Sequence, residues 1–191
     1  MSGAYLSNPL AFLVDTLFSL YILVVMLRFL LQWVRADFYN PVSQFLVRVT
    51  QPVLRPLRRF IPGVGGVDVA SLVLMVVLQA LALALIMMIY GVTPRVPYIL
   101  VRTPAELIST LLNLYLIAII VQAILSWVNP GHYHPAMALL YSLTEPVMRP
   151  FRRLIPVIGG IDLSPLAALL AIQVAKMLIL PPLNHVAPPF F

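Results

Sequence analysis

The sequence lacks cysteine and has few of the other residues on which enzyme chemistry depends. The absence of cysteine excludes disulfides, thiolate nucleophiles, iron–sulfur clusters and cysteine-bound zinc. The six acidic residues are scattered along the chain, which disfavours paired carboxylates for general acid–base catalysis. No P-loop, nucleophile elbow or His-Glu-x-x-His motif is present. We therefore expect no enzyme, no catalytic residue and no cofactor.

Histidine is also scarce, with three in the chain. His132 and His134 flank Tyr133 in "PGHYHP", a spacing that suits a metal, but no third ligand lies near them in sequence. His185 is expected on the other side of the membrane. No histidine lies within a predicted membrane span, which disfavours haem ligation there. We expect no metal site.

Charged residues make up only 9% of the chain, whereas 62% is hydrophobic and the mean hydropathy is +1.01. Soluble domains carry about 25% charged residues, so this composition indicates a membrane protein. Four apolar stretches approach the roughly 20 residues that cross a bilayer, at about 10–34, 69–90, 105–128 and 163–183. The first lacks a basic leader and a cleavage site, so we expect a retained span. The sequence predicts an all-α membrane protein with four transmembrane helices.

The basic residues are unevenly distributed between the segments that connect these spans. Eight of the 12 lie in the two long linkers, whereas the short connection has only Arg95 and Arg102 and the tails have none. Under the positive-inside rule both linkers are cytoplasmic and both termini face the opposite side. Because the positive charge reports orientation and lipid contact, direct binding of nucleic acid is not expected.

The chain contains an internal repeat with an offset of 94 residues, which places residue 50 on residue 144. "TQPVLRPLRRFIPGVGGVD" (50–68) and "TEPVMRPFRRLIPVIGGID" (144–162) match at 12 of 19 positions. Each repeat, 1–92 and 93–191, is a helix, a cytoplasmic linker and a second helix. Two crossings per repeat make the copies parallel, related by an axis along the membrane normal. This geometry disfavours transport by rocking of inverted repeats.

The linker segments 41–61 and 135–155 are predicted to be amphipathic helices, because apolar residues recur at steps of three or four with arginines between them. Pro52 disfavours helical geometry at the residue before it, so we expect two short helices in each linker. Such helices should lie in the cytoplasmic interface, each cation contributing about 1 kcal/mol at anionic headgroups. The candidate lipid- or partner-binding residues are Arg55, Arg58, Arg59, Arg149, Arg152 and Arg153.

Each linker ends in Gly-Gly-x-Asp directly before an apolar run. The glycines permit a turn, and the aspartate caps the N-terminus of the following transmembrane helix. An open alternative adds an ion pair between the aspartate and Arg58 or Arg59, which would fold the linker against the membrane helices. A catalytic or cation-binding aspartate is least favoured. The candidate turn and cap residues are Gly65, Gly66, Asp68, Gly159, Gly160 and Asp162.

Four charged side chains fall inside or at the edge of the predicted spans, where a central charge costs about 2.5–3.5 kcal/mol. Asp15 and Lys176 lie at similar depths from the outer ends of their helices, which predicts an ion pair joining the two repeats. The alternatives are separate snorkelling of each residue to the outer interface, and a functional proton or ion site. Arg28 is expected to snorkel to the cytoplasmic interface, and Glu106 to lie at the outer one.

Gln79 and Gln173 are repeat equivalents near the membrane midplane. We expect each to make a hydrogen bond between helices, worth about 0.6 kcal/mol on average. The alternative is a hydrophilic lining for a narrow pathway.

The doubled block P-V-x-R-P-x-R-R-x-I-P-x-x-G-G-x-D, followed by an apolar helix, resembles the YggT family of small bacterial and plastid membrane proteins. The resemblance covers most of the chain, and the two-copy form is similar to the proteobacterial members. It implies a bacterial inner membrane protein with no established enzymatic activity. In such a membrane the positive-inside rule places both termini in the periplasm. The roles that the resemblance implies are osmotic or potassium stress tolerance, cell division and nucleoid distribution and, in plastids, assembly of a membrane cytochrome complex.

These observations favour a non-enzymatic scaffold or assembly factor that presents basic amphipathic helices at the cytoplasmic membrane surface. The alternative is a channel or transport component for osmotic or potassium homeostasis. The expected partners are anionic phospholipid and a membrane or cytoplasmic protein, with a second copy of the chain as an open alternative.

Overall fold

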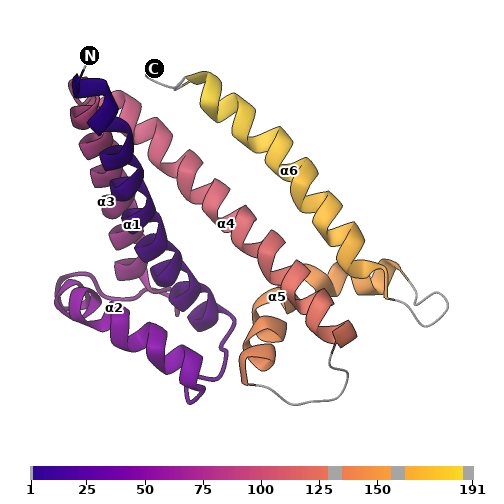
Figure 1. Ribbon diagram of the computed structural model, residues 1–191. Coiled ribbons are helices and arrows are strands. Elements are labelled where there is room, and N and C mark those ends of the chain that lie inside the picture. The colour runs from indigo at the N-terminus through magenta and orange to yellow at the C-terminus, as the bar shows by residue number, and fades with distance from the viewer. Residues whose placement is uncertain (1, 129–134, 156–161, 187–191) are drawn as a thin grey trace.

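The computed structural model describes residues 2–128, 135–155 and 162–186, which form six helices (Figure 1). Four of them are long and apolar enough to cross a membrane: α1 (Ser2–Trp33), α3 (Val69–Ile89), α4 (Val96–Val128) and α6 (Ser164–Val186). The linkers form α2 (Pro41–Phe60) and α5 (Pro135–Leu154). The predicted fold class, an all-α protein with four transmembrane helices in two repeats, is confirmed.

The first helix of each repeat is longer than its apolar run. We predicted starts near residues 10 and 105, but α1 begins at Ser2 and α4 at Val96, with Pro9 and Pro104 inside the helices. The apolar run marks only the part that crosses hydrocarbon, whereas the helix continues beyond it. In α4 an ion pair one turn apart, Arg102 Nη2 to Glu106 Oε1 at 2.7 Å, supports this extension.

The prediction of two short helices in each linker is wrong. α2 continues through Pro52 and Pro56, and α5 continues through the equivalent prolines. Both prolines of α2 are exposed, so the missing backbone hydrogen bonds lie on the side of the helix that faces away from the protein. The opposite side, with Thr50 and Leu54 fully buried, holds the helix together as one piece.

The two linker helices lie at one end of the molecule, across the ends of the transmembrane helices (Figure 1). The beginning of α1 and the end of α6 lie at the opposite end, as two crossings per repeat require. Helix α1 packs against α3, and α4 packs against α6, whereas the contact between repeats runs mainly through α3 and α4. Within the described part of the chain, α1 and α6 do not touch.

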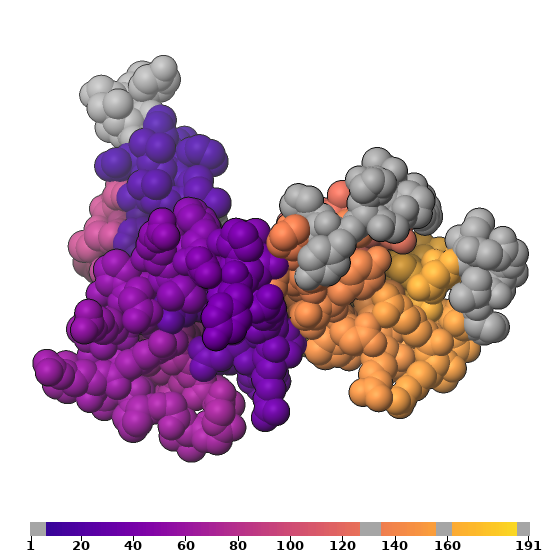
Figure 2. Space-filling model, turned by 90° about the horizontal axis from the view of Figure 1, so that it is seen from below, coloured from indigo at the N-terminus to yellow at the C-terminus, as the bar shows by residue number. Residues whose placement is uncertain are grey.

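One hydrophobic core extends across both repeats. It is built mainly from α1 and α3, and includes Leu114 and Ala118 of α4 and Leu139 and Leu143 of α5. A smaller cluster lies inside the second repeat, around Ile119, Met148, Ala168 and Ile172. Seen from the linker end, the repeats form two neighbouring masses (Figure 2). The second repeat therefore completes the core of the first, while its own remains smaller.

Candidate functional site

Each linker helix is fixed to the first membrane helix of its own repeat through a fully buried threonine. Arg28 Nη1 donates a hydrogen bond to Thr50 Oγ1, and the equivalent contact in the second repeat joins Thr144 Oγ1 to Gln122 Oε1. Thr50 also donates to the Leu46 carbonyl oxygen at 2.7 Å, within α2. No sequence pattern predicted this contact, although the offset that aligns Thr50 with Thr144 also aligns position 28 with position 122.

The prediction that Arg28 snorkels to the interface is wrong. Its side chain is buried and points to α2, where it also donates to Gln51 Oε1 at 3.0 Å. A buried guanidinium is costly unless its N–H groups find acceptors, and Thr50 and Gln51 supply two of them. Arg28 therefore fixes the position of α2 beneath α1.

Asp68 joins the end of α2 to the start of α3. It is the N-cap of α3, accepting from the Ser71 backbone N–H at 3.4 Å and from the Ser71 hydroxyl. Arg58 Nη2 lies 2.5 Å from Asp68 Oδ2, with side-chain exposures of 34% for Arg58 and 4% for Asp68. The cap and the linker–aspartate ion pair, posed as alternatives from the sequence, thus occur together.

The charge of Asp68 is set by opposing effects. Burial raises the pKa of its carboxyl, but hydrogen bonds from Arg58 and Ser71, together with the positive charge of Arg58, outweigh burial. The net result is a pKa below the usual range, so Asp68 is ionised at neutral pH. The chain enters this site through a turn in which Gly65 and Gly66 have φ of 60° and 84°, values that favour glycine.

The equivalent site in the second repeat is looser. Asp162 Oδ1 accepts from the Ser164 backbone N–H at 2.9 Å, but Arg152 Nε is 3.7 Å from Asp162 Oδ2. Arg152 is shared, because its Nη1 lies 2.7 Å from Oε2 of Glu145. The first repeat has the neutral Gln51 at the position of Glu145. The candidate residues Gly159 and Gly160, with His132 and His134, lie outside the described residues.

The six candidate arginines divide into two groups. Arg58 and Arg152 are paired with the aspartates that precede α3 and α6. The other four are exposed and have no ion-pair partner within the described residues: Arg55, Arg59, Arg149 and Arg153. This second group is available to bind lipid headgroups or a partner.

Part of the apolar surface of α2 is also left uncovered. The side that packs on the membrane helices carries Ser43, Leu46, Thr50 and Leu54. Phe45, Val49 and Phe60 are exposed instead, although the sequence places them among the apolar positions of the helix. Exposed arginines and exposed apolar side chains thus occur together on one helix, as in helices that lie in a membrane interface.

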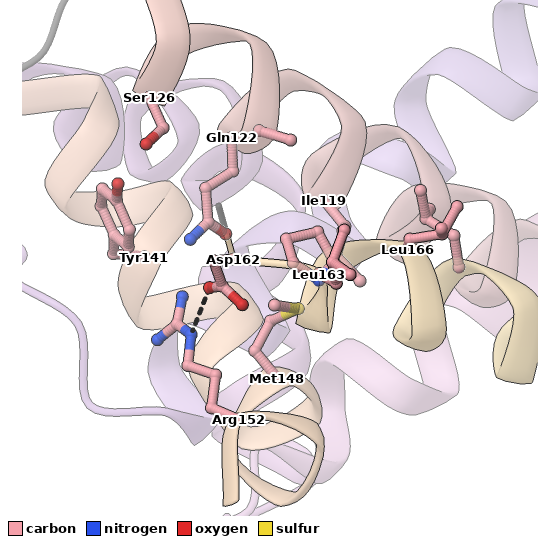
Figure 3. Close-up of a pocket in the computed structure, with 12 residues that line it drawn as sticks. Ile119, Gln122, Ser126, Tyr141, Met148, Arg152, Asp162, Leu163 and Leu166 are labelled. Atoms are coloured by element: carbon pink, nitrogen blue, oxygen red, sulfur yellow. Dashed lines mark ion pairs between the residues drawn. The ribbon is translucent and has the colours of Figure 1, made fainter. Parts of the chain in front are cut away.

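A cavity of about 410 Å³ opens between α4, α5 and the start of α6 (Figure 3). One part of its wall is polar, formed by Gln122, Ser126, Tyr141, Arg152 and Asp162, and the Arg152–Asp162 ion pair crosses it. The rest is apolar and includes Ile119, Met148, Leu163 and Leu166. The cavity can therefore accept an amphiphilic group.

Differences between the repeats account for this cavity. Gln122, Ala123 and Ser126 line it, and the equivalent positions in the first repeat carry the larger Arg28, Phe29 and Gln32. The second repeat therefore has less side-chain volume between its membrane helices and its linker helix.

The predicted ion pair between Asp15 and Lys176 does not form. Lys176 Nζ instead donates to Asn113 Oδ1 at 2.7 Å, which joins α6 to α4 within the second repeat. Because the repeats meet through α3 and α4, α6 is held away from α1. Asp15 lines a separate cavity of about 320 Å³ at the opposite end, with Arg102 and Glu106. No cluster of His, Cys, Asp and Glu suited to a metal occurs in the described part of the chain.

Gln79 and Gln173 have different surroundings despite their equivalent positions. Gln79 is buried on α3, whereas Gln173 is exposed on α6. Neither side chain makes a hydrogen bond to another helix among the described residues, contrary to our expectation. Since one faces inward and the other outward, they do not line a common pathway.

Comparison with known proteins agrees with this two-repeat architecture. The family model CCB3/YggT matches the chain twice, over residues 7–89 and 101–183. An uncharacterized protein of Pseudomonas aeruginosa is 48% identical over 177 residues, covering 92% of this chain and 90% of its own length. The uncharacterized protein YggT of Escherichia coli K12 is 41% identical over 170 residues, covering 89% and 88%. No solved structure matches the chain.

A protein from Vibrio alginolyticus, described as an uncharacterized protein in the proC 3' region, is 44% identical over 173 residues, covering 90% of this chain and 93% of its own length. The resemblance seen in the doubled block is thus confirmed along nearly the whole sequence. With two matching repeats and four apolar helices that indicate a multi-pass membrane protein, the chain belongs to the CCB3/YggT family.

Proposed function

We propose that the protein is a non-enzymatic scaffold or assembly factor of the bacterial inner membrane, with its linker helices cytoplasmic and its termini periplasmic. The observation that supports this most directly is the way α2 and α5 are held. Each is fixed to the first membrane helix of its repeat by a buried threonine contact, and near its C-terminal end by an arginine–aspartate pair. Both helices are therefore presented in defined positions at one end of the molecule.

The exposed surface of these helices suits anionic phospholipid. Four exposed arginines, Arg55, Arg59, Arg149 and Arg153, each contribute about 1 kcal/mol when they lie near anionic headgroups. Phe60 places an exposed aromatic side chain on α2, where it can enter the boundary between headgroups and acyl chains.

A fixed surface also favours assembly with a protein partner. Binding costs free energy for every side chain and segment that must become ordered, and a preorganised helix avoids part of that cost. In this proposal α2 and α5 bind a membrane or cytoplasmic protein from the cytoplasmic side. No chemical step on the partner is required.

The proposed binding of anionic lipid is tested by replacing four exposed arginines with glutamine: Arg55, Arg59, Arg149 and Arg153. Thermal unfolding would be measured in nanodiscs with and without anionic phospholipid. We expect the wild-type protein to melt at a higher temperature with anionic lipid, and the variant to lose most of that difference. Arg95→Gln, in the short connection at the opposite end, is the matched control and should keep it. If the melting temperature of the quadruple variant depended on anionic lipid as much as that of the wild type, the proposed lipid binding would be contradicted.

The proposed binding of a protein partner is tested in cells with a photo-crosslinking amino acid at position 59 or 153. A defined protein adduct, absent when the amino acid is placed at position 95, is the expected result. The rival channel function predicts a different outcome. Ion flux into liposomes that is carried by the wild-type protein and abolished by Gln79→Leu would contradict the scaffold proposal.

A further inference from the structure

The second repeat packs on the first through an apolar face of α4 and α5. Leu114 on α4 and Leu139 and Leu143 on α5 are buried in the core formed by α1 and α3. A hydrogen bond at the edge of this contact, from Asn40 Nδ2 to the Pro135 carbonyl oxygen at 2.7 Å, joins the two linker helices. We call the α4–α5 surface around these three leucines the docking face of the second repeat.

The first repeat carries the same face without a cover. The repeat offset aligns Leu114 with Leu20, Leu139 with Phe45 and Leu143 with Val49. Leu114 is 5% exposed whereas Leu20 is 55% exposed, and Phe45 and Val49 are likewise exposed. The docking face of the first repeat, on α1 and α2, therefore lies open at one edge of the molecule.

The complementary surface shows the same asymmetry. In the first repeat Met26 and Leu30 of α1 line an apolar cavity together with Leu111 of α4, so they lie where the second repeat docks. Their equivalents in the second repeat are Ile120 and Ile124. Met26 is 4% exposed and Ile120 43%, and Leu30 and Ile124 differ in the same direction. This receiving face is covered in the first repeat and open in the second.

Lipid alone covers these open faces poorly at two places. Gln173 is exposed on α6, about ten residues or roughly 15 Å from the cytoplasmic end of the helix, near the middle of the hydrocarbon. Its equivalent, Gln79, is buried on α3. A side-chain amide facing hydrocarbon leaves its hydrogen-bonding groups unsatisfied, so a neighbouring helix is a better environment than lipid. Phe45 and Val49, on α2, lie outside the membrane-spanning helices.

We propose that a second copy of the chain covers these faces in the way that the second repeat covers the first. The α1–α2 face of one copy packs against the α4–α6 face of the other, so that Gln173 is buried as Gln79 is. Both repeats cross the membrane in the same direction, so the two copies keep a common orientation. The contact is heterologous, and it closes on itself when both copies contribute both faces.

The test uses two sets of variants, one for each face. Leu17 extends the docking face of the first repeat, because it is exposed and the repeat offset aligns it with Leu111 of α4. Leu17→Ala, Leu20→Ala and Phe45→Ala reduce this docking face. Ile120→Ala, Ile124→Ala and Gln173→Leu reduce the receiving face of the second repeat. The matched control is Val77→Ala, Leu81→Ala and Met88→Ala, which removes exposed apolar groups from α3, a helix that carries none of the face substitutions. Circular dichroism and thermal unfolding confirm that each variant is folded, and differently tagged copies are co-purified from nanodiscs or cells.

We expect wild-type and control chains to co-purify, and each face variant to lose at least about tenfold of its self-association, equivalent to roughly 1.4 kcal/mol. A mixture of the two face variants should regain association, because each supplies the intact face that the other lacks. Folded wild-type chains that stay monomeric in the bilayer would overturn the proposal. A mixture that associates no better than either variant alone would overturn it too, since that result indicates a contact between like faces.

Discussion

Asp68 and Asp162 are the same residue type at equivalent positions, yet their different neighbours predict different contributions to the stability of the protein. Asp68 is nearly buried and accepts from Arg58 and Ser71, whereas Asp162 is partly exposed and shares Arg152 with Glu145. An unpaired buried charge is far more costly than an unpaired exposed one. Substitution of each aspartate by asparagine should therefore lower the free energy of unfolding by a different amount.

Asp68→Asn is expected to destabilise the protein by about 1–3 kcal/mol, because it leaves Arg58 without its charged acceptor in a partly buried place. Asp162→Asn should cost no more than about 1 kcal/mol, as for exposed pairs. Thermal or denaturant unfolding in the same detergent checks both. Equal losses in the two variants would show that the difference in burial has no energetic consequence.

The lowered pKa of Asp68 also predicts that the stability of the folded protein depends on pH. A carboxyl that is more acidic in the folded than in the unfolded state contributes stability that is fully present above the unfolded pKa, near 3.8. That stability is lost as the pH falls through the lower folded value. The wild-type protein should lose more stability than Asp68→Asn as the pH is lowered below about 4. Parallel loss in both proteins would contradict this assignment.

At the scale of the helix, one buried threonine contact helps to fix the position of each linker helix. The hydroxyl of Thr50 faces a charged arginine, and that of Thr144 faces the neutral amide of Gln122. Removing an acceptor from a buried cation costs more than removing one partner of a neutral pair. Pro52 and Pro56 are exposed and do not hold α2 against the membrane helices. The Arg28–Thr50 hydrogen bond is therefore expected to be important for holding α2 in place.

Thr50→Val should therefore loosen α2 more than Thr144→Val loosens α5. Hydrogen exchange measured by mass spectrometry would show faster exchange of α2 amides in the first variant, with an expected loss of about 1–3 kcal/mol of protection. Ser142→Ala, which removes a hydroxyl bonded only to its own helix at Ala138, is the control. Unchanged exchange in α2 would mean that packing alone holds it.

The cavity in the second repeat gives a prediction about packing. Ala123 lines it, and the first repeat has Phe29 at the equivalent position. Ala123→Phe should fill part of this space and raise the melting temperature, since added contacts replace a void. Ala123→Leu, with a smaller side chain, should give a smaller increase. A decrease in both variants would indicate overpacking and a site that does not accept an aromatic ring.

At the scale of the whole molecule, the two ends of the bundle differ in charge and in structure. The linker end carries the eight arginines of the linkers, and the other end carries the beginning of α1, the end of α6 and the short connection. Under the positive-inside rule, this arrangement predicts that the linker end faces the cytoplasm.

The absence of native cysteine makes the orientation easy to measure. Single cysteines at Arg59 and at Thr93 should react with a membrane-impermeant thiol reagent from opposite sides. In intact cells with a permeable outer membrane, the cysteine at position 93 is expected to be labelled, and the one at position 59 only after lysis. The reverse pattern would place the linkers in the periplasm and contradict the proposed orientation.

Much of the fold was predictable because it follows from local properties of the chain. Hydropathy gave the four spans, and the aspartate after Gly65-Gly66 marked the cap of α3. The continuous α2 was not predictable from Pro52 alone, because the buried side with Thr50 and Leu54 outweighs the local effect of a proline on the exposed side. The environment of Arg28 was missed for a similar reason, since its acceptors are 22 and 23 residues away.

The sequence by itself determined the class of protein, the number of spans, the parallel repeat and the family, because composition, hydropathy and the 94-residue offset need no knowledge of contacts between distant segments. Only the tertiary structure decided which of two equivalent residues is buried. Gln79 and Gln173 occupy the same place in their repeats, yet the first has a following repeat beside it and the second has none. Neighbours in space, which the repeat pattern alone does not specify, give identical motifs different surroundings and leave two complementary faces open.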